Sequence, residues 1–95
     1  MEEKYLLDEA MEEIHGAKHY AKCAMKWREK DPVKAKKYFD LAQDELRHAD
    51  TLYHMAEGGN PTRSELEAAF LCDMREQYAE KLAHVKAMLE AFRGN

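Results

Sequence analysis

Helix-breaking residues occur at only two places in this chain, at Asp31-Pro32 and at Gly58-Gly59-Asn60-Pro61. The whole sequence of 95 residues holds only four glycines and two prolines, whereas an all-β fold needs turn residues about every 8 to 12 positions. Its 45% hydrophobic content is too high for a disordered chain. We therefore predict an all-α protein in which residues 1–95 form a single domain.

The breakers and capping signals divide the chain into helices near residues 3–30, 33–57 and 62–92. Asp31 suits the N-cap of the second helix and Pro32 suits its first position. Gly58-Gly59 suits a left-handed C-cap, and Thr62-Arg63-Ser64-Glu65 is typical of a capping box. Because the first turn is only two or three residues long, the first two helices are predicted to form an antiparallel hairpin.

Charge and terminal sequence argue against several partners. Fifteen basic and nineteen acidic residues give a net charge of -4, and the two signs are interleaved, which argues against nucleic acid. The chain has no run of 18 apolar residues and starts Met1-Glu2-Glu3-Lys4, unlike a signal peptide, so we expect a cytoplasmic protein that does not bind membranes. Cys23 and Cys72 lie too far apart to indicate a disulfide framework or a cysteine zinc site.

Each predicted helix carries an apolar stripe at helical spacing. In the first helix the stripe holds Leu7, Ala10, Ile14, Ala17, Ala21, Ala24 and Met25, with Glu13 and Tyr20 on its shoulder. In the second it holds Ala35, Tyr38, Leu41, Ala42, Ala49, Leu52 and Ala56, with Glu45 in its middle and His48 at its edge. In the third it holds Leu66, Phe70, Leu71, Met74, Tyr78, Val85, Met88, Leu89 and Phe92, interrupted by Lys81.

Glu45 is the anomaly, because a carboxylate within an apolar stripe needs a proton, a cation or a metal ion. Counted back from Asp31, Glu13 lies about 27 Å along its helix; counted forward, Glu45 and His48 lie about 21 and 26 Å along theirs. Glu13 is therefore level with the turn from Glu45 to His48, to within one helical turn. Two carboxylates and one imidazole at a dry helix interface suit Fe, Mn or Zn.

These residues resemble the ferritin-like di-iron carboxylate proteins, including rubrerythrins and two-helix encapsulated ferritins. In that family a Glu is followed by a Tyr seven residues later, as in Glu13 and Tyr20, and the next helix carries Glu-x-x-His, as in Glu45-Leu46-Arg47-His48. The resemblance covers roughly residues 5–57. It implies that Glu13, Glu45 and His48 bind iron, that Tyr20 hydrogen-bonds the site or quenches radicals, and that the activity is ferroxidase or peroxide-linked iron oxidation.

The family site needs two Glu and two Glu-x-x-His units from four helices, but this chain has one such set on its core face. A two-fold homodimer would supply the second set and complete a ferritin-like four-helix bundle. This predicts a di-metal site at a dimer interface, with two Fe per dimer, Mn or Zn as substitutes, and O₂ or peroxide as the oxidant. A chain this small also has a thin core, which favours a dimer or a higher homo-oligomer.

Two other functions remain open at this point. Glu45 could form a buried ion pair with Lys81 or Arg28 in a non-catalytic helical interaction module, or the site could hold zinc in a purely structural dimer. Further pairs at ligand-like spacing are expected to lie on solvated faces: Glu12 with His15, His15 with His19, and Glu80 with His84.

Overall fold

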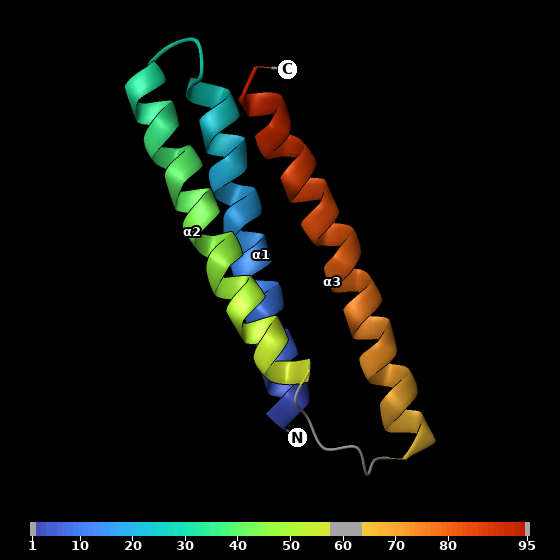
Figure 1. Cartoon of the computed structure of the whole chain (residues 1–95). Coiled ribbons are helices and arrows are strands. Elements are labelled where there is room, and N and C mark those ends of the chain that lie inside the picture. Colours follow the sequence, from blue (N-terminus) through green and yellow to red (C-terminus); the bar gives the residue numbers. More distant parts are fainter. Residues whose placement is uncertain (1, 58–63, 95) are drawn as a thin grey trace.

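The computed structural model describes residues 2–57 and 64–94. They form three helices, α1 (Glu2–Trp27), α2 (Pro32–Glu57) and α3 (Glu65–Phe92), and no strand is present in these residues. Helices α1 and α2 form an antiparallel hairpin, and α3 lies alongside it in the same direction as α1 (Figure 1). The molecule is a rod of 52 × 17 × 15 Å. The predicted all-α fold, a hairpin plus a third helix, is confirmed.

The turn between α1 and α2 starts earlier than predicted. Helix α1 ends at Trp27 instead of near residue 30, and the Asp31 N–H donates to the Trp27 carbonyl at 2.8 Å. The Asp31 carboxylate accepts a hydrogen bond from the Lys34 N–H at 3.1 Å, which confirms Asp31 as the N-cap with Pro32 in the first helical position. Because a proline disfavours helical backbone at the residue before it, α1 has to end before Asp31.

Helix α3 begins at Glu65, three residues later than predicted. The capping residue is Ser64, whose hydroxyl accepts a hydrogen bond from the Glu67 N–H at 3.1 Å. The predicted capping box was therefore two residues out of register, since the Ser–Glu pair at the required spacing is Ser64 with Glu67. Thr62 and Arg63, and the predicted Gly58-Gly59 cap, lie outside the described residues.

Alanines fill the contact between α1 and α2. The fully buried alanines of these two helices are Ala10, Ala17, Ala21, Ala24, Ala35, Ala42, Ala49 and Ala56. Small side chains allow helix backbones to approach closely, so the hairpin packs tightly although it buries few large residues. The larger side chains at this contact are Ile14 and Phe39. The sequence analysis did not place Phe39 in the core.

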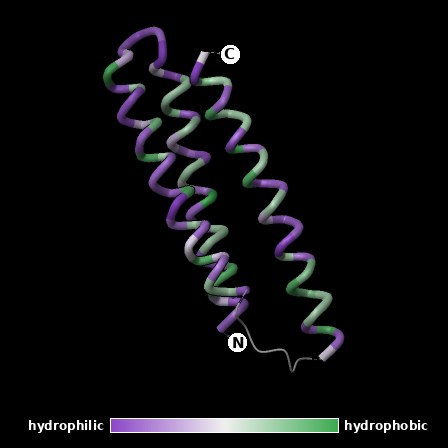
Figure 2. Tube along the Cα trace, in the orientation of Figure 1, coloured by the Kyte–Doolittle hydropathy of each residue, from purple (hydrophilic) through white to green (hydrophobic). Residues whose placement is uncertain are grey.

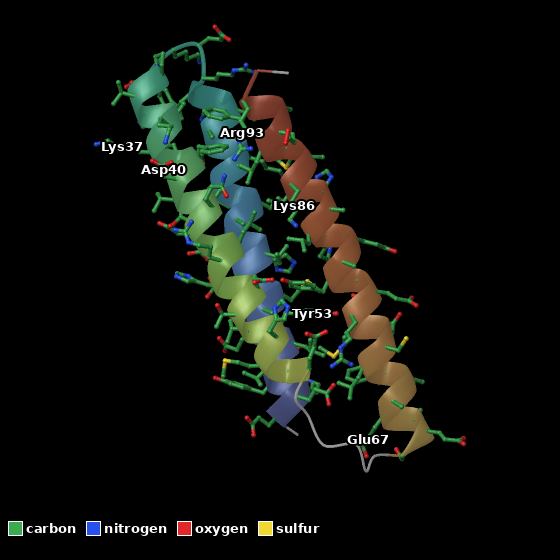
Figure 3. The ribbon with its side chains drawn as sticks, viewed as in Figure 1. Lys37, Asp40, Tyr53, Glu67, Lys86 and Arg93 are labelled. Atoms are coloured by element: carbon green, nitrogen blue, oxygen red, sulfur yellow. The ribbon has the colours of Figure 1, made fainter. Side chains whose placement is uncertain are left out.

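Helix α3 packs on one side of the hairpin through Leu71, Tyr78, Val85 and Leu89, all buried. Tyr53 lies between α2 and α3, and its ring is tilted against Tyr78 with centroids 4.4 Å apart (Figure 3). In the first turn of α1, the buried Glu3 carboxylate accepts a hydrogen bond of 2.5 Å from the Arg75 guanidinium of α3. Buried apolar side chains, aromatic contacts and the Arg75–Glu3 ion pair therefore all contribute to holding α3 in place.

Hydrophilic and apolar segments alternate along all three helices (Figure 2). Four predicted stripe residues are nevertheless exposed: Met25, Leu41, Leu66 and Phe70. Leu66 is 81% exposed because α3 begins beyond the end of the hairpin; Leu71, five residues later, already packs against Leu6, Leu7 and Ala56. A helical wheel gives the apolar face of a helix but not the length over which another helix covers it.

Both cysteines are free, as predicted. Among the described helices, none combines the length and the apolar character needed to cross a bilayer.

Candidate metal centre

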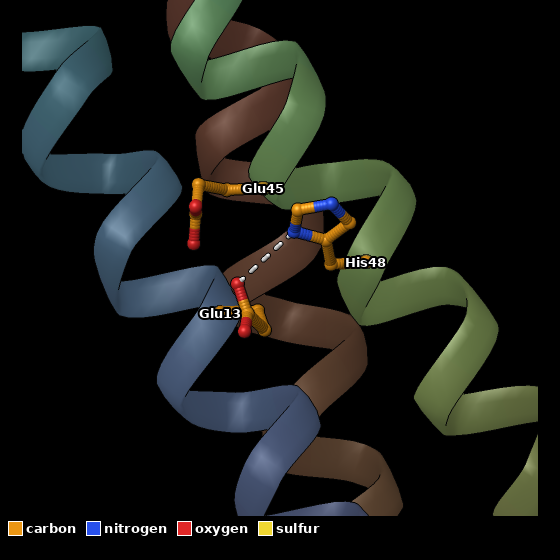
Figure 4. A group of neighbouring side chains, drawn as sticks. All are labelled: Glu13, Glu45 and His48. Carbon is orange, nitrogen blue, oxygen red and sulfur yellow. Dashed lines mark ion pairs between the residues drawn. The ribbon is translucent and has the colours of Figure 1, made fainter.

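The structure brings Glu13, Glu45 and His48 together between α1 and α2. One ligand atom from each residue lies within 4.8 Å of the others, and His48 Nδ1 is 3.7 Å from Glu13 Oε2 (Figure 4). The level match counted from the turn at Asp31 therefore holds. It holds because two straight, antiparallel helices joined by a short turn keep the same rise per residue along their length.

The group is less buried than predicted. The Glu13 side chain is 27% exposed and the His48 side chain is 62% exposed, while Glu45 is half-buried. The expected dry interface is therefore wrong for the single chain. The reason is that α3 lies behind the hairpin, whereas the three side chains are in front of it (Figure 4).

The two glutamates perturb each other. A side-chain hydrogen bond with Glu13 raises the pKa of Glu45 above its ordinary value of 4.5. Partial burial and the negative charge of Glu13 raise this pKa further, and His48 opposes them. A carboxyl group beside another carboxyl group is harder to ionise unless a positive charge compensates it.

These residues belong to a longer pattern on the uncovered side of the hairpin, which we call the open face. Its α1 members, spaced alternately by four and three residues, are Glu9, Glu13, Gly16, Tyr20, Cys23 and Trp27. Its α2 members, spaced alternately by three and four, are Tyr38, Leu41, Glu45, His48, Leu52 and Met55. Every α1 member is half-buried, and Leu41 and Met55 are 42% and 56% exposed. This alternation is the pattern of helices that pack along a seam.

Tyr20 lies on the same face without contacting the group. Its ring stacks on Tyr38 at 6.2 Å and is tilted against His19 at 5.6 Å. No hydrogen bond joins the Tyr20 hydroxyl to Glu13 or Glu45 in the described part of the chain. Its predicted role at the site stays a prediction.

The sequence analysis overlooked Gly16. It lies one turn after Glu13, and a Cβ placed there would be 2.9 Å from Glu45 Oε2. The available signal was a single glycine in the middle of a long helix, where glycine is unfavourable.

The cations considered as partners for Glu45 lie elsewhere. Arg28 donates to the Ala91 carbonyl at 3.2 Å and stacks on Phe92. Lys81 is exposed and lines a cleft of about 290 Å³ between α1 and α3. Neither pairs with Glu45 among the described residues.

The remaining ligand-like pairs do not join the group. His15, Glu80 and His84 line the cleft between α1 and α3. His19 faces Cys23, with Nε2 3.8 Å from Sγ, and Glu12 is exposed. Within the described residues, the group that could hold a metal ion is Glu13, Glu45 and His48.

No protein-family model, curated protein or solved structure matches this chain.

Proposed function

We propose that this protein binds iron through Glu13, Glu45 and His48, and that two copies pair through their open faces to build a di-iron centre that oxidises Fe(II). The observation that carries the proposal is the convergence of these three ligand atoms within 4.8 Å on the face of the hairpin that α3 leaves uncovered.

The ligand types and distances suit a divalent transition metal. Carboxylate oxygens and an imidazole nitrogen together favour Fe, Mn or Zn over softer or harder ions. Neighbouring ligands on such an ion are about 3.0 to 3.4 Å apart when the bonds are about 2.1 Å long. The three ligand atoms lie within 4.8 Å of one another, so metal binding requires these flexible side chains to move inward by up to about 2 Å. Three ligands from one chain also leave coordination positions for further groups.

The raised pKa of Glu45 has a direct consequence for binding. Without a cation, the neighbouring Glu13 makes Glu45 harder to ionise. A divalent ion favours the ionised form of Glu45 and competes with its proton. Metal binding should therefore release a proton and be stronger at higher pH.

The open face supports pairing with a second copy. Leu41 and Met55 lie seven residues before and after His48, so the three residues form one line along α2. A two-fold axis along this face would bury both exposed apolar side chains and bring two sets of ligands together. The resulting bundle of four helices would have one α3 on each outer side.

When bound as a pair, iron ions supply electrons for the reduction of O₂ or peroxide. The chain itself contributes the ligands: Glu13 and Glu45 from facing helices, and His48 from the most exposed position. Tyr20, stacked on Tyr38, is proposed to quench radicals close to the centre. Covering by the partner would exclude bulk water from the ligands.

The test is an anaerobic titration of the metal-free protein with Fe(II), with the molar mass followed in parallel. Two Fe(II) per dimer, followed on exposure to O₂ by the absorbance of ferric oxo species, is the expected result. Glu45→Ala should abolish both signals.

Two other results would contradict the proposal. Zinc binding at the same stoichiometry with no iron oxidation would indicate a structural zinc dimer. No stoichiometric binding of any divalent metal would leave a helical interaction module whose open face docks on a partner.

A further inference from the structure

The Glu45 carboxylate lies very close to the backbone of α1 at Gly16. A Cβ built on Gly16 would lie 2.9 Å from Glu45 Oε2 and 3.5 Å from Glu45 Cδ. The first distance is shorter than real Cβ contacts allow. The Glu45 carboxylate therefore occupies the space that any other residue would fill with its side chain.

The backbone gives no other reason for a glycine at this position. Gly16 lies well inside α1, and the glycine with positive φ in the described residues is Gly94. Glycine in a helix interior lowers helix stability relative to alanine. The chain thus keeps an unfavourable residue one turn from Glu13, opposite a carboxylate that needs the space.

We infer that Gly16 is a positioning residue for the metal centre: its missing Cβ lets the Glu45 carboxylate reach α1 and lie beside Glu13. This inference rests on the proposed metal binding. Gly16 contributes no ligand atom; it sets the separation between the two glutamate ligands.

Gly16→Ala tests the inference because helix stability and metal affinity should change in opposite directions. Glu45 Oε2 is the end of a flexible side chain, so the variant folds and only the carboxylate has to move. Without metal, the melting temperature should rise by about 4 °C from the gain in helix propensity. Affinity for Mn²⁺, measured by calorimetry, should fall at least about tenfold, the usual effect of losing a residue that supports metal ligands.

Two further variants separate positioning from a general effect on α1. Lys22→Ala changes an exposed residue of the same helix and should leave Mn²⁺ affinity unchanged. Glu45→Asp shortens the ligand by one methylene, so it should weaken Mn²⁺ binding in the wild-type chain and weaken it much less in the Gly16→Ala background. A general packing defect would instead give additive losses.

The outcomes are distinct. If wild type and Gly16→Ala bind Mn²⁺ equally, or if the losses of Gly16→Ala and Glu45→Asp add, the positioning role is wrong and the proposed metal site stands. If the wild type itself binds no Mn²⁺, Fe²⁺ or Zn²⁺, the proposed function fails and the positioning role fails with it. A large affinity loss in Gly16→Ala together with a higher melting temperature supports the inference.

Discussion

At the scale of single residues, the raised pKa of Glu45 beside Glu13 leads to a prediction for the protein without metal. The raised pKa of Glu45 means that the folded state holds a proton more tightly than the unfolded state. Stability should therefore fall as the pH rises above 4.5, through the raised pKa of the folded state. Glu45→Gln keeps a hydrogen-bonding group and cannot ionise. The stability of this variant should therefore not fall with pH in this way.

The measurement is the urea midpoint of the metal-free protein between pH 4 and pH 8. At neutral pH Glu45→Gln should be more stable than the wild type by up to about 1 kcal/mol, a small gain because the site is half-exposed. Metal binding should be lost. Equal pH profiles for the two proteins would show that the carboxyl groups do not interact.

His48 should contribute to metal affinity and have little effect on folding stability. Its side chain is 62% exposed, so His48→Ala should change the free energy of unfolding by less than about 0.5 kcal/mol. The same change should weaken Fe(II) affinity at least about tenfold. His54→Ala is the matched control, since His54 is an equally exposed histidine of α2. A similar loss of affinity in both variants would argue against His48 as a ligand.

The three proposed ligands could be predicted from sequence because their levels depend only on the rise per residue and the position of one turn. Two features could not be predicted. The exposure of the site depends on which side of the hairpin α3 covers, and periodicity does not contain that information. Gly16 was overlooked because its role is the absence of a side chain beside a residue 29 positions away.

At the scale of elements, the Arg75–Glu3 ion pair should hold the first half of α3 against α1. Glu3 is buried, so losing the charge-assisted hydrogen bond from Arg75 removes a favourable interaction of a desolvated carboxylate. Arg75→Met should therefore cost about 2 kcal/mol of unfolding free energy in urea titrations. Arg47→Met is the control: Arg47 pairs with Asp44 on the same helix in an exposed position, and its loss should cost less than about 0.5 kcal/mol. Equal costs would mean that the contact between α3 and α1 does not depend on Arg75.

Tyr78 should lower the free energy of unfolding at alkaline pH. Its burial between α3 and the hairpin, with smaller contributions from Asp50 and Tyr53, raises its pKa to about 12. Between pH 10 and 12 the unfolded state loses this proton and the folded state keeps it, so stability falls as the pH rises. Tyr78→Phe should reduce that fall in urea midpoints, whereas Tyr5→Phe, at a 62% exposed position, should not. An unchanged alkaline profile in Tyr78→Phe would contradict the burial of this hydroxyl.

Helix number and order were predictable because breakers and caps are local signals. The ends were less accurate, by up to three residues, both at the end of α1 before Pro32 and at the start of α3. Ser64 caps α3 by accepting a hydrogen bond from the Glu67 N–H, and the competing cap Thr62 could not be ruled out from sequence. The place of α3 on one side of the hairpin is tertiary information that no single helix encodes.

At the scale of the whole molecule, the open face should determine the oligomeric state. Leu41→Lys places a charge on that face, one heptad before His48, and should convert the proposed dimer to a monomer in light scattering. Because the proposed centre uses the ligands of two chains, Fe(II) affinity should fall when the dimer is lost. Leu66→Lys is the control, since Leu66 is 81% exposed on α3. A monomeric wild type would contradict the pairing.

The most direct test of the account is the anomalous scattering of Mn²⁺ in crystals of the protein. If the proposed centre is right, the crystals should show two Mn²⁺ peaks a few ångström apart that are related by a two-fold axis, each bound by Glu13, Glu45 and His48, with the open faces of two chains in contact. Mn²⁺ bound elsewhere, or no ordered Mn²⁺ near Glu45, would contradict it.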